Sequence, residues 1–241
     1  HGGPWQNNIE IKKKYNLKQA MDSSKKSFEV DILNNFKIIH IDTSIGINNK
    51  PVSLNDSLER FYELFEHCNI FAKKNKKKVF FEIGTEEQSG TTNTPEELNY
   101  TLNKIFSFCR KKKFDKPLFV VIQSGTKVAE TRNIGSFESP LRIENELPVE
   151  IQLPKMIEIC TKNKTHNNLY IVTGHTSTDN AETFFLNLAR GSNFGGLSGI
   201  PNKRLLNEDY FLVRPFMIFS RDDTAEICKK LKIPFWVDPT N

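Results

Sequence analysis

A histidine and two carboxylates lie close together in the C-terminal third of the chain. His175 follows an apolar run at 169–173, and Asp179 and Glu182 come shortly after it. A spacing of three places the two carboxylates on one face of a helix. Just beyond a buried strand, an imidazole can contact a phosphate and carboxylates can hold Mg²⁺. The pattern predicts phosphate chemistry, with His175, Asp179 and Glu182 as catalytic residues and Asp179 as a magnesium ligand.

Two arginines, two glycines and an asparagine extend this predicted site. Arginine suits phosphate oxygens, and glycine permits close approach of the backbone to nucleotide or RNA. The residues that we expect to contact nucleotide or RNA phosphate are Arg190, Gly195, Gly196, Arg214 and Asn241.

Several of these residues also have a purely structural explanation. Asp179 can cap a helix, Glu182 can be a first-turn acid, and Arg190 can be a C-terminal cation that complements the helix dipole. For each residue alone the two explanations are about equally good. What favours function is that the residues belong to a block of strings that resembles a known family in order and spacing.

The elements that must position these residues alternate between helix and strand along the whole chain. Strand-like apolar runs occur at 37–42, 79–84, 117–123 and 169–173. Segments with helical spacing occur at 11–36, 56–73, 94–112, 153–162 and 184–190, and again after Ser220. Strands that are apolar on both faces and separated by helices predict an α/β fold with parallel sheets covered by helices.

Polar side chains stand at the carboxyl ends of three predicted strands in the first part, where function gathers in such sheets. They are Asp42, Glu82 and Gln123. Each alone can close a loop by hydrogen bonding, but three in succession favour a site. The polar stretch at 124–148 has the length of a functional or mobile loop.

The formal net charge is +5, which fits contact with nucleic acid only weakly. Much of the excess lies in the basic runs at 73–78 and 110–113, which close two predicted helices. There, cations can complement the helix dipole and remain solvated, or they can form an RNA-binding patch. The first explanation is the simpler, and the second stays open.

Apolar runs and cysteines indicate the cellular compartment. No apolar run approaches the roughly 20 residues of a membrane helix, and the first residues do not form a signal peptide. We therefore expect no membrane partner. The four cysteines contain no CxxC pair, so they predict buried thiols in a reducing, cytoplasmic environment. The chain begins at His1 rather than at Met, from which we expect that the natural N-terminus lies upstream.

Five strings in the C-terminal part carry a resemblance to a known family. They are GHTSTDNAET (174–183), LARGSNFGGLSGI (188–200), LVRP (212–215), SRDDTAEI (220–227) and DPTN (238–241). In order and spacing they resemble tRNA(Ile)-lysidine synthetase, of the N-type ATP pyrophosphatase superfamily. The resemblance implies part of a Rossmann-like parallel sheet over 165–241, with ATP and Mg²⁺ as cofactors. It also implies that tRNA(Ile) and lysine are substrates: the family adenylates an anticodon cytidine, and lysine then displaces AMP.

A second resemblance concerns residues 1–164. The strings HGGPWQN (1–7), HIDTS (40–44), EIGTE (82–86) and QLPKMIEIC (152–160) resemble the non-catalytic subunit type of D-tagatose-1,6-bisphosphate aldolase. This resemblance implies part of a TIM-type (β/α) barrel, a role in sugar-phosphate metabolism and a catalytic aldolase subunit as partner. By its likeness to metal-dependent aldolases, His1, Asp42 and Glu82 would be the functional residues at the strand ends.

Both resemblances lack pieces that their families need. No Ser-Gly-Gly-x-Asp-Ser string, which grips ATP pyrophosphate in the superfamily, occurs in the sequence, and only three or four barrel strands can be counted. Three hypotheses remain: part of a lysidine-forming ligase, an aldolase-type subunit, or a composite of two incomplete domains. We favour the composite, and we expect the chain as it stands to be inactive.

Overall fold

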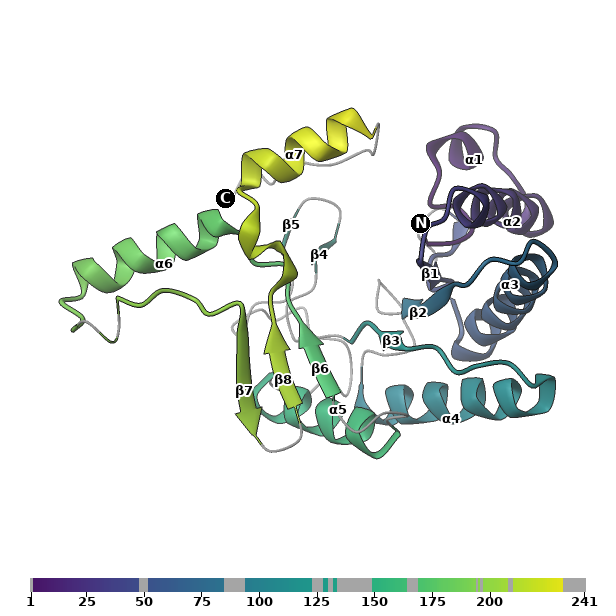
Figure 1. Cartoon of the computed structure of the whole chain (residues 1–241). Helices are drawn as coiled ribbons and strands as arrows, with labels where there is room; N and C mark the ends of the chain where they lie inside the picture. The colour runs from purple at the N-terminus through teal and green to yellow at the C-terminus, as the bar shows by residue number, and fades with distance from the viewer. Residues whose placement is uncertain are drawn as a thin grey trace. The chain divides into compact units, whose positions relative to one another are not determined.

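The computed structural model describes residues 2–47, 52–84, 94–122, 128–129, 132–133, 149–163, 169–193, 195, 197–207 and 210–231. The contacts within the chain divide it into two compact units, His1–Thr165 and His166–Asn241. Figure 1 shows the elements of both units.

A three-stranded parallel sheet organises the first unit. Strands β1 (Ile38–Asp42), β2 (Phe80–Gly84) and β3 (Phe119–Val120) lie in that order, and every pairing is parallel. Helix α3 (Leu54–Lys74) connects β1 to β2, and α4 (Pro95–Lys112) connects β2 to β3. The predicted alternation of strand and helix is therefore confirmed for this stretch. A short antiparallel pair, β4 (Val128–Ala129) and β5 (Arg132–Asn133), follows.

Local capping signals explain where these helices begin. The Ser53 hydroxyl accepts a hydrogen bond from the Asp56 amide at 3.1 Å, which caps α3. At α4, Thr94 and Glu97 form a reciprocal capping box, and Pro95 occupies the first turn. A threonine followed directly by proline, with a glutamate three residues on, is a sequence signature of a helix start, and the predicted helix at 94–112 begins there.

The predicted helix at 11–36 is two helices in the structure. Helix α1 (Asn8–Lys12) ends in a turn where Lys14 has a positive φ of 52°. Helix α2 (Leu17–Leu33) starts afresh behind Asn16, whose side chain forms a capping box with Gln19. A strong N-cap in the middle of a helical pattern is thus the reason for the break.

The core of the first unit lies on one face of the sheet. The face carries Ile39, Ile41, Phe81 and Ile83, all of them buried. Helices α2, α3, α4 and α5 (Val149–Asn163) supply the rest of this core. Its largest fully buried side chains include Phe28, Ile32, Phe61, Leu64, Phe65, Leu98, Ile105 and Met156.

The described residues do not show the predicted TIM-type barrel. The prediction was for part of such a barrel, whereas the described residues of the first unit form a parallel sheet of three strands and a separate antiparallel pair. The side of the sheet away from the core carries Ile38, His40, Phe80 and Glu82, which are all partly or largely exposed. The first unit is therefore described as an open α/β layer.

The second unit contains a small mixed sheet. Its elements are β6 (Leu169–Val172), α6 (Ser177–Ala189), β7 (Lys203–Asn207), β8 (Tyr210–Val213), the 3₁₀ turn η2 (Pro215–Ile218) and α7 (Arg221–Lys230). Strand β8 lies in the middle, parallel to β6 and antiparallel to β7. The parallel pair agrees with the predicted ATP pyrophosphatase sheet. The sequence did not predict β7, and α6 begins before the predicted helix at 184–190.

The second unit buries little of its apolar surface. Met217 is the one buried apolar residue among its described residues, while Phe185 is 65% and Ile218 is 73% exposed. Tyr170 and Val172 of β6 and most apolar residues of α6 are therefore largely exposed to solvent, unlike most apolar residues of α3. Of the described helices in either unit, none has the length and hydropathy to cross a membrane.

Candidate functional site

The predicted residues converge where β6 leads into α6. The Thr173 amide donates to the Val213 carbonyl at 3.1 Å, so the pairing of β6 with β8 continues to the ends of both strands. His175 follows β6, and its Nδ1 lies 2.9 Å from the Thr173 hydroxyl oxygen. Arg214 follows β8. His175 and Arg214 thus lie beyond the carboxyl ends of neighbouring parallel strands, the usual place for a ligand in an open α/β sheet.

Asp179 takes part in capping α6, which the sequence left as one alternative: Thr176 is the N-cap residue, and Asp179 stands three positions after it in the capping box. Its Oδ2 accepts hydrogen bonds from the amide and the hydroxyl of Thr176, both at 2.7 Å. The Thr176 amide does most to lower the pKa of Asp179. Partial burial opposes this effect, while the Thr176 hydroxyl, Arg221 and His175 add to it. The carboxylate is therefore held in its ionised form at the start of α6.

Arg221 joins the two predicted catalytic carboxylates. One of its guanidinium nitrogens, Nη2, lies 3.3 Å from Asp179 Oδ1 and 3.4 Å from Glu182 Oε1. Its backbone amide also donates to the Thr178 hydroxyl at 3.0 Å, which fastens the start of α7 to the start of α6. Sequence reasoning missed Arg221. The available signal was its place inside the matched string at 220–227.

Asn180 connects α6 to the glycine-rich turn. Its Oδ1 accepts a hydrogen bond from the Ile200 amide at 2.6 Å. Gly199 has a φ of +74° and sits so close to the Asn180 side chain that a Cβ there would crowd the amide. Asn180 and Gly199 therefore fix the turn beside the N-terminal end of α6, a role that sequence reasoning did not assign to either residue.

Two of the other predicted contacts lie apart from each other. Arg190 is the C-cap of α6, eleven residues after Asp179, which is roughly 16 Å along a helix axis. Arg214 stays near the turn, because its Nη1 donates to the Pro201 carbonyl at 2.7 Å. The structure thus brings Arg214 toward the site and leaves Arg190 at the far end of α6.

The remaining predicted residues are glycines and the terminal asparagine. Gly195 is exposed, and its carbonyl accepts a hydrogen bond from the Ser198 hydroxyl at 2.9 Å. Gly196 and Asn241 lie outside the described residues. Their predicted contacts with phosphate stay predictions.

The carboxylates fit a guanidinium better than a magnesium ion as they are arranged. Mg²⁺ demands near-octahedral oxygen ligands and keeps several waters. Here one oxygen of Asp179 is committed to Thr176, and the other shares Arg221 with Glu182. No group of three or more potential metal ligands occurs among the residues that the structure describes. We therefore derive no step through Mg²⁺.

Two predicted strand-end residues of the first unit, Glu82 and Asp42, contact different partners. Glu82 Oε2 lies 2.9 Å from His40 Nδ1 on the open face of the sheet. Asp42 is 3% exposed and accepts hydrogen bonds from Ser44 and Gln6. Burial raises the pKa of Asp42, against the hydrogen bonds and the nearby imidazole. Both carboxylates thus have internal partners.

Two further residues predicted for these strand ends, His1 and Gln123, lie outside the described part of the chain. Their predicted roles are therefore not tested, and the metal chemistry implied for His1 stays a prediction.

Gly84 makes room for the His40 imidazole. It pairs with Asp42 at the carboxyl end of β2, and a Cβ at this position would overlap the imidazole ring. The contact between His40 and Glu82 thus depends on a glycine two residues beyond Glu82.

Comparison with known proteins bears on the second unit. Residues 156–241 match the model of the PP-loop domain family. The C-terminal segment is similar to PP-loop domains. Over 84 residues the chain is 56% identical to the tRNA(Ile)-lysidine synthase of Prochlorococcus marinus subsp. pastoris. This aligned stretch is 35% of this chain and 25% of that protein. The chain is also 44% identical over 78 residues to the synthase of a Nostoc species, a stretch that is 32% of this chain and 23% of that protein.

The matches cover part of each protein. The chain spans about a quarter of the length of the curated relatives it matches. The match starts at residue 156, inside α5, where Met156 is buried in the core of the first unit. The resemblance of the C-terminal part is confirmed at this level. None of these findings supports the aldolase resemblance of residues 1–164 or the expected inactivity of the chain.

The capping box predicts a measurable order of effects on Asp179. Thr176→Val removes the hydroxyl donor, and Arg221→Gln removes the nearby cation. Both should raise the pKa of Asp179, Thr176→Val by more, because the hydroxyl is the larger influence. A carboxyl-carbon NMR titration of the full chain measures this pKa.

The sign for stability follows from the same shift. The folded-state pKa lies below the ordinary value of 3.8, so the stabilisation by ionised Asp179 is complete above that pH. It is lost as the pH falls through the folded-state pKa. If Arg221→Gln raised the pKa of Asp179 more than Thr176→Val did, the result would contradict this account.

Gly84→Ala should destabilise the first unit by pushing the imidazole away from Glu82. We expect a loss of about 1–2 kcal/mol in the free energy of unfolding, the usual cost of a broken, partly buried hydrogen bond. In a His40→Ala background the same change should be nearly neutral. Urea denaturation of the four proteins in this cycle gives the coupling. An equal loss in both backgrounds would show that the imidazole is not the obstacle.

Proposed function

We propose that residues 156–241 form part of the nucleotide-binding domain of an ATP-dependent ligase that modifies tRNA(Ile). In the proposed reaction ATP adenylates an anticodon cytidine and releases pyrophosphate. Lysine then forms a carbon–nitrogen bond and displaces AMP. The observation that carries the proposal is the His175, Asp179 and Glu182 set at the end of β6, inside the segment that is similar to lysidine synthases.

The N-terminal end of α6, together with His175 and Arg214, suits an anionic nucleotide. The N-terminal end of α6 presents the positive end of the helix dipole. His175 and Arg214 lie beyond the ends of the two parallel strands, so they can face the same phosphate group. The Thr173 hydroxyl orients the imidazole. We assign His175 to contact the adenylate phosphate and Arg214 to neutralise charge on it.

The carboxylates have a different role in this proposal. Asp179 holds the first turn of α6 through Thr176, and it shares Arg221 with Glu182. They thereby fix α7 against α6 and keep acid charge close to the proposed nucleotide. A carboxylate pair there can also attract a cationic amine, which is the form in which lysine would arrive. The substrates tRNA(Ile) and lysine belong to the proposal as a whole.

A graft tests this proposal. Residues 156–241 would replace the matching segment in the Prochlorococcus synthase, to which the chain is 56% identical over 84 residues. We expect ATP-dependent incorporation of radioactive lysine into tRNA(Ile). His175→Ala in the graft should reduce the rate by about 100-fold or more, as loss of a group that stabilises a transition state does.

Asp222→Asn is the matched control, because Asp222 is an exposed acid in the first turn of α7 outside the Arg221 pair. It should leave the rate within about twofold of the graft. A folded graft that binds tRNA(Ile) but incorporates no lysine would refute the assignment. An unchanged rate in His175→Ala would refute the role of the imidazole.

A further inference from the structure

Positive charge gathers along the edge of the first-unit sheet where its strands begin. In a parallel sheet each connecting helix returns the chain to this edge. Helix α3 ends at Lys74, six residues before β2 begins at Phe80, and α4 ends at Lys112, shortly before β3. In Figure 1 the chain runs from the end of α4 back to β3. Both basic runs therefore close helices at the same edge.

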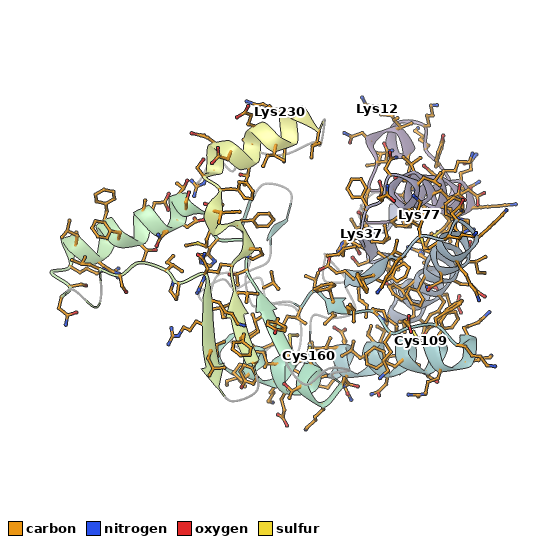
Figure 2. All side chains as sticks on the ribbon, viewed as in Figure 1. Lys12, Lys37, Lys77, Cys109, Cys160 and Lys230 are labelled. Carbon is orange, nitrogen blue, oxygen red and sulfur yellow. The ribbon has the colours of Figure 1, made fainter. Side chains whose placement is uncertain are left out.

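Hydrogen bonds hold this edge together. The Phe80 amide donates to the Lys37 carbonyl at 2.7 Å, so the residue before β1 lies against the start of β2. The Lys77 ammonium donates to the Asn35 side chain at 2.7 Å. The Leu118 amide donates to the Phe81 carbonyl at 3.0 Å, which brings the start of β3 alongside β2. Lys37 and Lys77 are labelled in Figure 2.

We call this surface the basic edge. It consists of Lys37, Lys73, Lys74, Lys76, Lys77, Lys78, Arg110, Lys111, Lys112, Lys113 and Lys116. The one acid inside these runs is Asp115. The runs at 73–78 and 110–116 hold ten of these cations and a single acid, so positive charge is dense in both runs.

Helix dipoles alone do not account for the number of cations. The last turns hold Lys73 and Lys74 in α3 and three cations in α4. The dipole acts only within that last turn, so Lys37, Lys78 and Lys116 gain little from it. Like charges this close repel one another. Among the described residues of these runs, the ion pair of Lys112 with Glu66 at 2.6 Å offsets a small part of that repulsion.

We propose that the basic edge binds the phosphate backbone of RNA. Runs of cations at the ends of adjacent helices, packed about 10 Å apart, offer rows of point charges that match a polyphosphate chain. Lys73, Lys74 and Lys111 are exposed and available for such contacts. The choice of RNA over DNA rests on the proposed function of the second unit. The graft experiment contains none of the basic edge, so the two proposals fail separately.

Fluorescence anisotropy of a labelled RNA hairpin with the full chain tests the proposal across a salt series. The edge variant is Lys73→Gln/Lys74→Gln/Lys111→Gln. The control, Lys12→Gln/Lys13→Gln/Lys14→Gln, removes the same charge near the opposite end of β1, where Trp5 donates to the Tyr15 carbonyl and Gly2 pairs with Asp42. Lys12 is also labelled in Figure 2.

We expect the edge variant to raise the Kd by about tenfold at fixed salt and to reduce the slope of log K against log salt by about 2. The control should change the Kd by less than about twofold. An equal effect of both variants would show that only net charge matters. Tighter binding to duplex DNA of equal length would assign the edge to DNA, and tighter binding to vesicles of anionic lipid would assign it to membranes; each result would overturn the proposal.

Discussion

Coverage of a sheet face by apolar helix surface is the constraint on which the first unit depends. Phe61, Phe65 and Leu64 of α3 lie against Phe81 and its neighbours, and each fully buried side chain of this kind contributes roughly 1.5–3 kcal/mol. The strand ends, the capping boxes and the basic edge all take their positions from that packed face. In the second unit the equivalent surface is largely exposed. There the site depends on local hydrogen bonds and on the Arg221 ion pairs.

The contrast changes how the second unit is interpreted. Its chemistry-bearing residues are arranged by short-range contacts: Thr176 with Asp179, and Asn180 with Ile200. Such contacts form without a large core, because each involves a helix terminus or a tight turn. A segment that covers about a quarter of its relatives can therefore hold the end of β6 and the start of α6 together. The apolar faces of its sheet and helix remain available for packing.

Local signals in the sequence predicted more than distant ones did. The helix starts at Thr94 and Ser220 could be predicted, because an N-cap residue and its capping-box partner lie only three residues apart in the sequence. The role of Arg221 was not predicted, because its partners Asp179 and Glu182 lie 42 and 39 positions away in the sequence. No local sequence pattern indicates such a pairing. Strand β7 was missed because three of its five residues, Lys203, Arg204 and Asn207, are polar, so it has no apolar run. Strand β8 was not predicted either. The motif order at 174–227 identified the PP-loop resemblance, whereas the aldolase resemblance of residues 1–164 found no support.

Hydrogen exchange, followed by mass spectrometry on the full chain, tests the unequal packing of the two units most directly. Amides in covered elements open only with large-scale unfolding, whereas those in poorly covered elements open locally. The account predicts slow exchange in β1, β2 and α3 and markedly faster exchange in β6, β8 and α6. Protection of β6 and β8 equal to that of β1 and β2 would contradict it.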